Sequence, residues 1–461
     1  MDNAYTGRVN KHIRLSLPNA SGALTMVTAA VSGAGGIVGE VHRLHENTRR
    51  RMVELDIIAA SEEQWAAIVQ ALTDLDQVQI EGEADPALEA HRGGLIDVQP
   101  TVPFRSEEDF TTFYTSGAAS VAQTIAHASH LAQLYTAIPR LVALVTNGEA
   151  ILSLRGIGPR AAMPLLEGKA VLLNTVTMLS GVPILLATSD PTEIVRTLGH
   201  IAPTFAAICV EGIAAPACFV VEEALISQLR QPVWHDDQHG AAVVVLAAML
   251  TLTRRSRHAL KRLRVGLVGL GAAGIGIARL LRTAGMRHVL GMDPRKDACL
   301  HFALFGGHAT TLEEVMQEAE VVVATTGDPG SIRPELVRRG QTLLALSHLT
   351  PEIAPDAARA AGAQYVADGR MLTSALVFPG LLRGALDAGS TQITDAMKLA
   401  AAEAIAHQSE GPLLLPSALD PMLHLRVAHA VRDSVQREQT GPAKGRPPSL
   451  PKKEEEHDVT R

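Results

Sequence analysis

The sequence predicts an α/β protein with a small N-terminal domain, a middle domain built on a parallel sheet, and a dinucleotide-binding domain. Three observations support this fold. Strands and helices follow the order β-α-β-β-α-β near the N-terminus, apolar strands alternate with helices in the middle, and a glycine-rich turn joins a strand to a helix after residue 268. The chain has 461 residues, enough for about three domains of ordinary size.

The composition is that of a globular protein without nucleic-acid or membrane partners. Apolar residues make up 47% of the chain but aromatic residues only 3%, so Ala, Val, Leu and Ile must form the cores. The net charge is −7 without a dense basic stripe, and the longest apolar run, residues 241–252, is too short to span a bilayer. Because the N-terminus also lacks an apolar signal core, we expect a soluble cytoplasmic protein. The widely spaced Cys209, Cys218 and Cys299 predict neither a disulfide framework nor a zinc site.

Residues 10–85 predict a ferredoxin-like unit. The expected strands are 12–18, 37–47, 50–60 and 78–84, and the expected helices are 22–36 and 62–76. The opening LPNASGALTMV, residues 17–27, resembles the ACT domain, a regulatory module that senses small molecules. This resemblance implies a ligand or dimer site at the loop after the first strand. Effector binding and simple dimerisation both stay open.

Residues 86–240 predict a buried parallel sheet, because apolar strands alternate with helical crossovers. The expected strands are 141–148, 182–189, 204–212 and 232–237, and the expected helices are 161–179, 190–202 and 217–229. Ligands of such sheets collect at the carboxyl ends of the strands. Glu211 and the adjacent pair Asp236 and Asp237 fall at two of these ends, which makes them candidates for a functional site.

Residues 241–438 predict a Rossmann-type domain. The segment GLGAAG places Gly269, Gly271 and Gly274 around Ala272 and Ala273, after a strand and at the start of a helix. The first glycine permits a tight turn. The second lets the backbone approach a pyrophosphate at the helix N-terminus. The segment is therefore predicted to bind a dinucleotide.

The choice of dinucleotide depends on Asp293, which ends the next predicted strand about 20 residues further on. A carboxylate there binds the ribose hydroxyls and repels a 2′-phosphate, so the sequence favours NAD, while the neighbouring Arg295 leaves NADP open. Helices at 393–406 and 424–436 are expected to close the fold. The Pro-rich, charged tail 439–461 is predicted to be disordered.

The segment PVWHDDQHGAA, residues 232–242, sets Asp236 and Asp237 side by side between His235 and His239. Adjacent carboxylates repel each other, so something should compensate them. One hypothesis is a bound Mg²⁺ or Mn²⁺, since both ions prefer oxygen ligands. The alternative is an N-cap for a helix that begins at Gly240, and one Asp could cap while the other binds metal. The histidines could suggest zinc, but we expect them to be solvated.

Several segments together resemble the bacterial malic enzymes, in the short form that carries an N-terminal ACT domain. They are FYTSGAA (113–119), PLLEGKA (164–170), SDPTEIV (189–195), the HDDQHG segment, GLGAAGIGIA (269–278) and FPGLLRGALDAGSTQITDAMKLAAAEAIA (378–406). The resemblance runs from about residue 10 to residue 435 in the family's order. It implies a homo-oligomer that oxidatively decarboxylates (S)-malate to pyruvate with NAD(P) and Mg²⁺ or Mn²⁺.

By position, the resemblance implies a role for each candidate side chain. Lys169 matches the base that takes the hydroxyl proton, and Tyr114 matches the acid that protonates the enolate. Asp237 and Glu211 match metal ligands. Asp236 is a further candidate ligand, which could reach the metal only if its backbone turns inward. The structural alternatives are a solvated helix lysine for Lys169 and a half-buried loop tyrosine for Tyr114.

The chain departs from the family pattern around the substrate and the metal. Gly212 follows Glu211 where the family has Asp, so a metal-binding carboxylate is missing and Gly212→Asp should strengthen the site. The other departures are Asn147, Ser153, Arg155, Gly156, His348, Ser374 and the serine of YTSG. Three hypotheses follow: a malic enzyme, a sister enzyme for another 2-hydroxy acid in which Arg155, Arg160 or His348 contacts the anion, and a silent dinucleotide-binding paralogue.

Overall fold

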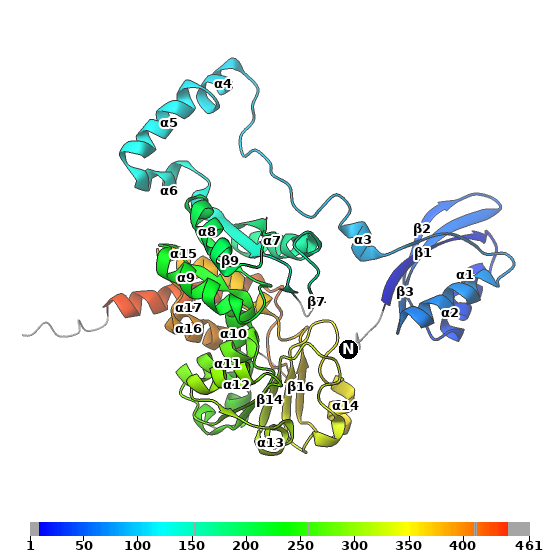
Figure 1. The fold of residues 1–461 in the computed structure, drawn as a ribbon. Helices are drawn as coiled ribbons and strands as arrows, with labels where there is room; N and C mark the ends of the chain where they lie inside the picture. The colour runs from blue at the N-terminus through cyan, green and yellow to red at the C-terminus, as the bar shows by residue number, and fades with distance from the viewer. Residues whose placement is uncertain (1–8, 152–153, 257–258, 410, 412, 441–461) are drawn as a thin grey trace, which may run out of the picture.

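The computed structural model describes residues 9–151, 154–256, 259–409, 411 and 413–440. Its ribbon shows a small N-terminal domain joined by a long segment to a larger body that contains two parallel sheets (Figure 1). Over the described ranges, no helix combines the length and the apolar character needed to cross a bilayer.

The N-terminal domain has the predicted ferredoxin-like order. Its elements are β1 (Val9–Pro18), α1 (Ala23–Gly33), β2 (Ile37–Glu46), β3 (Arg50–Ala59), α2 (Glu62–Thr73) and β4 (Gln79–Ala84). The strands pair antiparallel in the order β2-β3-β1-β4. Alternate residues of β1 and β3, such as Leu15 and Leu55, are buried in one core with Val27 and Ile68 of the helices, so both helices cover the same face.

Residues 86–140 form a helical arm, which corrects the expectation that strands and helices alternate from residue 86. The arm contains α3 (Pro86–Ala90), α4 (Glu107–Phe113), α5 (Ser116–His127) and α6 (Ala132–Tyr135). None of these helices buries a residue. Figure 1 shows α4 to α6 at the outer end of an extended segment that runs from α3, beside the N-terminal domain, to the body. The arm therefore has no apolar core of its own.

The middle sheet is parallel throughout, as predicted. Its strands are β5 (Leu141–Thr146), β8 (Ser180–Leu185), β9 (Ala207–Val210) and β10 (Val233–His235), in the order β10-β9-β5-β8. The crossover helices are α7 (Met163–Thr177), α8 (Pro191–Ile201) and α9 (Ala217–Gln228). A short hairpin, β6 (Ala150–Ile151) and β7 (Leu154–Arg155), follows β5.

The second parallel sheet confirms the Rossmann-type prediction. Its strands are β11 (Val265–Val268), β12 (Val289–Met292), β13 (His308–Ala309), β14 (Val321–Ala324), β15 (Thr342–Ala345) and β16 (Tyr365–Asp368). They lie in the order β13-β12-β11-β14-β15-β16, which reverses direction between β11 and β14. The helices are α11 (Ala272–Thr283), α12 (Lys296–Leu304), α13 (Leu312–Glu318) and α14 (Pro355–Ala360). A dinucleotide binds at such a switch point.

The helix α10 (Asp236–Ser256) joins the two sheets and crosses the boundary expected at residue 240. With α15 (Phe378–Asp387), α16 (Asp395–His407) and α17 (Pro421–Thr440) it belongs to one core that also contains Val142 of β5 and Leu267 of β11. The second and third predicted domains are thus packed around a shared core. The tail predicted to be disordered lies outside the described residues from 441 onward, while its first two residues end α17.

Candidate active site

A large pocket lies where the carboxyl ends of both parallel sheets meet α7, α10 and the segment before α15. It has a volume of about 990 Å³. The predicted site residues that line it are Lys169, Glu211, Asp236, Asp237, Gly269, Gly271, Ala272, Ala273 and Asp293. Tyr114 and Gly274 are the two predicted residues that do not. Long-range folding therefore brings the predicted base, the carboxylates and the dinucleotide turn into one cavity.

Lys169 is a buried member of this pocket, so the solvated-lysine alternative is wrong. Its side chain is 9% exposed, and its ammonium donates to Glu211 Oε2 at 2.8 Å and to Asp236 Oδ2 at 2.6 Å. The Phe378 ring lies 4.7 Å away. Burial acts to lower the pKa of Lys169, but attraction to Asp236 and Glu211 outweighs it and holds the pKa well above its usual value.

Both carboxylate oxygens of Asp236 accept hydrogen bonds from other side chains. Its Oδ1 accepts from Trp234 Nε1 at 2.8 Å, and its Oδ2 accepts from Ser374 Oγ at 2.7 Å as well as from Lys169. Burial raises the pKa of Asp236, but its attraction to Lys169 and these hydrogen bonds outweigh burial and lower it. Asp236 thus holds the lysine, and its contacts argue against the predicted role as a metal ligand.

The capping alternative for the Asp pair is also wrong. The helix α10 begins at Asp236 rather than at Gly240, so both carboxylates lie in its first turn. Neither accepts from an N–H of this helix. Asp236 bonds the side chains described above, and Asp237 Oδ2 accepts from the backbone N–H of Gly212 at 2.7 Å.

Glu211 and Asp237 bring carboxylate oxygens to the pocket, the ligand type that Mg²⁺ and Mn²⁺ prefer. Glu211 Oε1 is buried and has no hydrogen-bond partner. Burial, opposed by Lys169 and assisted by Asp236, raises the pKa of Glu211 to about 7. Burial, opposed by the Gly212 N–H and assisted by Asp236, raises the pKa of Asp237 to about 6. Ionising these two carboxyl groups costs free energy in the folded protein without a metal. A bound divalent cation would offset that cost, as expected for metal ligands.

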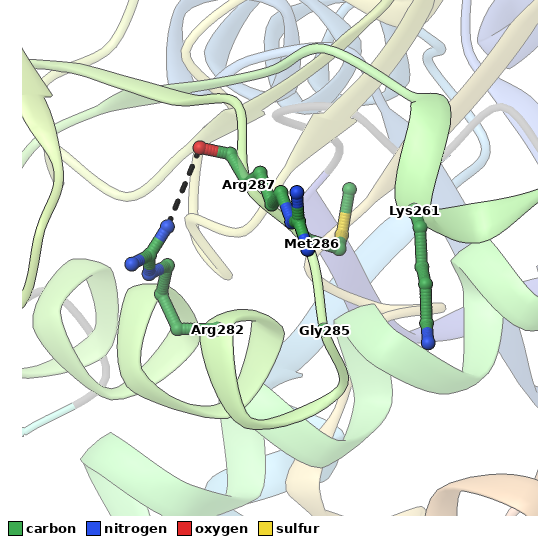
Figure 2. Close-up of a pocket in the computed structure, with 5 residues that line it drawn as sticks. All are labelled: Lys261, Arg282, Gly285, Met286 and Arg287. Atoms are coloured by element: carbon green, nitrogen blue, oxygen red, sulfur yellow. Dashed lines mark hydrogen bonds between the residues drawn. The ribbon is translucent and has the colours of Figure 1, made fainter.

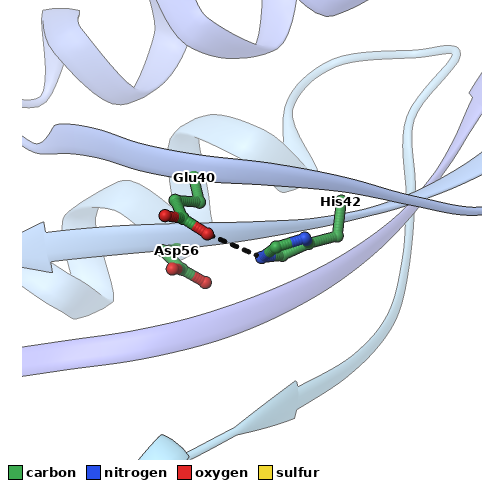
Figure 3. Close-up of side chains that lie close together, drawn as sticks. All are labelled: Glu40, His42 and Asp56. Carbon is green, nitrogen blue, oxygen red and sulfur yellow. Dashed lines mark ion pairs between the residues drawn. The ribbon is translucent and has the colours of Figure 1, made fainter.

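A different group of ligand-type side chains lies outside the pocket. Among the described residues, Glu40, His42 and Asp56 are the cluster whose potential metal-ligand atoms all lie within 4.8 Å of one another. Figure 3 shows them on β2 and β3 of the N-terminal domain, with the Glu40–His42 ion pair at 3.3 Å. Both residues of that pair are exposed, so a solvated surface cluster accounts for them.

His235 is buried and the side chain of His239 is only 11% exposed, contrary to the expectation that both are solvated. His235 is 0% exposed, and its Nδ1 accepts from Gln238 N at 3.3 Å. His239 Nε2 lies 2.6 Å from Glu222 Oε1, and its ring packs against Trp234. Neither ring lines the pocket, so zinc binding there has no support.

The glycine turn has the geometry that a dinucleotide site requires. Gly269 has φ +98°, a conformation that favours glycine, and Gly271 faces open space. A Cβ on Gly274 would lie 2.1 Å from Gly269 O, so Gly274 permits close packing of the turn rather than lining the pocket. Asp293 follows β12, accepts from Leu270 N at 2.8 Å and pairs with Arg295 at 3.3 Å. Its carboxylate lies at the pocket, as predicted.

A second cavity, of about 450 Å³, lies at the end of α11. Figure 2 shows its lining residues, Lys261, Arg282, Gly285, Met286 and Arg287, with Arg282 donating to the Arg287 carbonyl at 3.4 Å. The carbonyl end of a helix carries partial negative charge, so cations at this position stabilise α11. The cavity needs no ligand to explain its charges.

Comparisons with known proteins identify the family. The chain is 42% identical to "NAD-dependent malic enzyme 1" of Bacillus subtilis over 91% of this chain and 96% of that protein. It is 32% identical to "NAD-dependent malic enzyme" of Geobacillus stearothermophilus over 93% of this chain and 95% of that protein. The chain belongs to the malic enzyme family. A crystal structure of malic enzyme from Pyrococcus horikoshii matches with a TM-score of 0.71 and 34% identity, over 78% of this chain and 92% of that one.

One segment of the chain also matches a family of NAD-binding domains. Residues 224–328 match the model for the D-isomer specific 2-hydroxyacid dehydrogenase, NAD binding domain. The match contains the glycine turn and Asp293, and it begins before α10. NAD is accordingly the cofactor of the Rossmann-type domain.

The positions at which this malic enzyme departs from the family pattern are distributed unevenly. His348 and Ser374 line the pocket. Of the residues proposed to contact the substrate anion, His348 is therefore in place, whereas the exposed Arg160 does not line the pocket. Gly212 has φ +69°, and a Cβ there would lie 2.5 Å from Thr146 Oγ1, so the expected benefit of an Asp at this position meets a steric obstacle. Ser153 and the side chain of Arg155 lie outside the described part of the chain.

Sequence reasoning missed two partners of the site residues, Trp234 and Glu222. Trp234 adjoins the recognised Asp pair, but nothing in one sequence shows that its Nε1 points at Asp236. Glu222 lies in a predicted helix and carries no local signal.

Tyr114 is the predicted catalytic residue that a single chain of this malic enzyme does not bring to the pocket. It is the C-cap residue that follows α4 on the helical arm, is 73% exposed, and packs on Phe110 with ring centroids 5.4 Å apart. The half-buried loop alternative is wrong as well, because the side chain is largely exposed.

Proposed function

We propose that the chain catalyses the NAD-dependent oxidative decarboxylation of malate. The observation that carries this function is the position of Lys169, held between Glu211 and Asp236 in the same pocket as the dinucleotide turn. Once the ammonium has given up its proton, the neutral Lys169 amine can take the hydroxyl proton of a 2-hydroxy acid while hydride passes from C2 to NAD. The relatives named NAD-dependent malic enzymes support this choice of reaction.

Glu211 and Asp237 are the proposed metal ligands, because each has an oxygen that fits a cation. A bound Mg²⁺ or Mn²⁺ would polarise the C2 oxygen of malate, stabilise the charge left when CO₂ departs, and weaken the hold of the carboxylates on the Lys169 proton. Asp236 orients Lys169 from the other side. Ser374, which donates to Asp236, reaches the pocket where the family pattern has Asn.

Tyr114 is the proposed acid, supplied by a second copy of the chain. The helices of the arm that carries Tyr114 contain no buried residue. Several apolar side chains of the arm are exposed, namely Phe104, Phe110, Leu134 and Tyr135. Because exposed apolar faces of this kind associate, we propose a homo-oligomer in which the arm of one chain reaches the pocket of another. Its Tyr114 would then protonate C3 of the enolate.

The N-terminal domain is proposed to be an ACT-type module that binds a small effector or another copy of itself. The ferredoxin-like topology is compatible with either role. From the composition of the chain, we also propose that the protein is cytoplasmic.

The substrate is tested with purified protein, NAD or NADP, Mn²⁺ and a panel of 2-hydroxy diacids, with reduced nicotinamide and CO₂ both measured. Malate turnover with equal amounts of the two products is the expected result. Turnover of another acid in preference to malate would favour the sister enzyme. If NAD binds but no acid is oxidised, the silent paralogue is the better description.

The origin of Tyr114 is tested by mixing two inactive variants, Lys169→Met and Tyr114→Phe. In a mixed dimer, one pocket receives a wild-type lysine from one chain and a wild-type tyrosine from the other. Random mixing should therefore restore about a quarter of the wild-type activity. If Tyr114 served its own chain, every pocket in the mixture would lack one group and activity would stay absent.

A further inference from the structure

Glu222 of α9 is a buried carboxylate whose two oxygens bind two consecutive residues of the HDDQHG segment. Its Oε2 accepts from Gln238 Nε2 and its Oε1 from His239 Nε2, both at 2.6 Å. The residue is 5% exposed and does not line the pocket. Burial raises the pKa of Glu222, but the bond and attraction to His239 outweigh it and lower the pKa to about 2. Glu222 is therefore an ionised group held by the turn that carries the site carboxylates.

A continuous series of contacts leads from Glu222 to the proposed base. The His239 ring packs on Trp234 with centroids 5.4 Å apart. Trp234 Nε1 donates to Asp236 Oδ1 at 2.8 Å, and Asp236 Oδ2 accepts from Lys169 at 2.6 Å. Each contact orients the next group, because indole and carboxylate hydrogen bonds are directional.

The same turn is restrained from its other side by α11. A Cβ on Gly276 would lie 2.4 Å from the backbone carbonyl of Gln238, so α11 approaches the turn at backbone distance. Backbone packing thus limits movement toward the dinucleotide domain. On the side of α9, Glu222 supplies the restraint through two side-chain hydrogen bonds.

We propose that Glu222 is a positioning residue for the active site, which acts through His239, Trp234 and the first turn of α10 on Asp236 and Asp237. The inference rests on the proposed function and assigns a purpose to Gln238 and His239, which the proposed reaction does not use. A carboxylate is suited to this task because both of its oxygens accept, so one side chain can hold two donors at once. Loss of such an outer partner typically costs about 10–100-fold in activity or metal affinity.

Two substitutions separate positioning from general stability. Glu222→Met keeps the volume of the side chain but removes both acceptors. Glu222→Gln can keep both bonds, because Gln238 Oε1 is buried without a partner and could accept from the new amide once the Gln238 amide reverses. Glu223→Gln, at the exposed neighbouring position, is the matched control.

We expect Glu222→Met to lower kcat with malate by about 10–100-fold and to weaken Mn²⁺ binding, with NAD affinity unchanged. Glu222→Gln should stay within about threefold of wild type on both measures, and Glu223→Gln should not differ from wild type. Crystal structures of both Glu222 variants should show Asp236 turned away from Lys169 only in Glu222→Met.

Equal losses in the Gln and Met variants, or a Met variant that keeps wild-type kcat and Mn²⁺ affinity, would overturn the proposal. If Glu222→Met does not fold, Gln238→Met can be used in its place, because it removes one of the two hydrogen bonds to Glu222. An unchanged kcat in Gln238→Met would also overturn the proposal. If the wild-type protein does not oxidise malate, the proposed function is wrong, but the proposed role of Glu222 is not thereby refuted. Mn²⁺ affinity and the position of Asp236 would still decide the role of Glu222.

Discussion

Replacing Glu211 by Gln should stabilise the metal-free protein at alkaline pH. Glu211 is buried, close to Asp236 and Asp237, and its pKa is about 7 rather than the usual 4.5. At about 1.4 kcal/mol per pKa unit, ionising this carboxyl in the folded protein costs roughly 3 kcal/mol more than in the unfolded chain. Gln has nearly the same shape, never ionises, and can still accept from Lys169.

The pH at which this difference appears follows from the raised pKa. A group with a folded pKa above its unfolded value contributes stability that is present below the unfolded pKa and is lost as the pH rises through the folded pKa. The wild type should therefore lose this contribution between about pH 4.5 and pH 7. Glu211→Gln should match the wild type near pH 4.5 and exceed it by roughly 3 kcal/mol above pH 8.

The assay is urea unfolding of wild type and Glu211→Gln in a chelator at several pH values, followed by the same series with Mn²⁺. We expect Mn²⁺ to stabilise the wild type at pH 8 and to have little effect on the variant, since the variant lacks a ligand carboxylate. Two results would refute the reasoning: a variant less stable than wild type at pH 8, or a difference in the free energy of unfolding that is the same at all pH values. Either would show that Glu211 is not a carboxylate whose ionisation destabilises the metal-free protein.

Three further predictions test the other parts of the pocket. Lys169→Met should lower malate turnover by about 10²–10⁴-fold, as expected for loss of an acid–base group, while calorimetry shows unchanged NAD affinity; a loss below tenfold would remove Lys169 as the base. Gly212→Asp should lower the free energy of unfolding by about 1–2 kcal/mol, because φ is +69° and Thr146 is too close, and should not improve Mn²⁺ binding; tighter Mn²⁺ binding would show that the backbone adapts. Asp293→Asn should raise NADP affinity relative to NAD by about tenfold or more, since it removes the charge that repels a 2′-phosphate, and an unchanged ratio would point to Arg295 instead.

Local pattern was sufficient for the fold class and for much of the pocket. Alternating apolar strands and helices indicated two parallel sheets, and Glu211, the Asp pair, Gly269 and Asp293 each lie at the carboxyl end of a predicted strand. Such features depend on neighbouring residues and on the handed geometry of α/β units, so a single sequence contains them. Lys169 and Tyr114 were recognised only through resemblance to a family.

The roles within the pocket depended on contacts between distant residues. Lys169 lies 42 positions from Glu211 and 67 from Asp236 along the chain. Only their contacts in the folded protein show that Asp236 holds the lysine while Glu211 keeps an oxygen without a hydrogen-bond partner. Burial likewise decided that His235 and His239 are internal and that Tyr114 is not. The sequence by itself determined which groups are present and at which strand ends they lie. The tertiary structure decided which of them are charged, paired or left without a partner, because desolvation and hydrogen bonding are set by everything that surrounds a side chain and not by its neighbours in the chain.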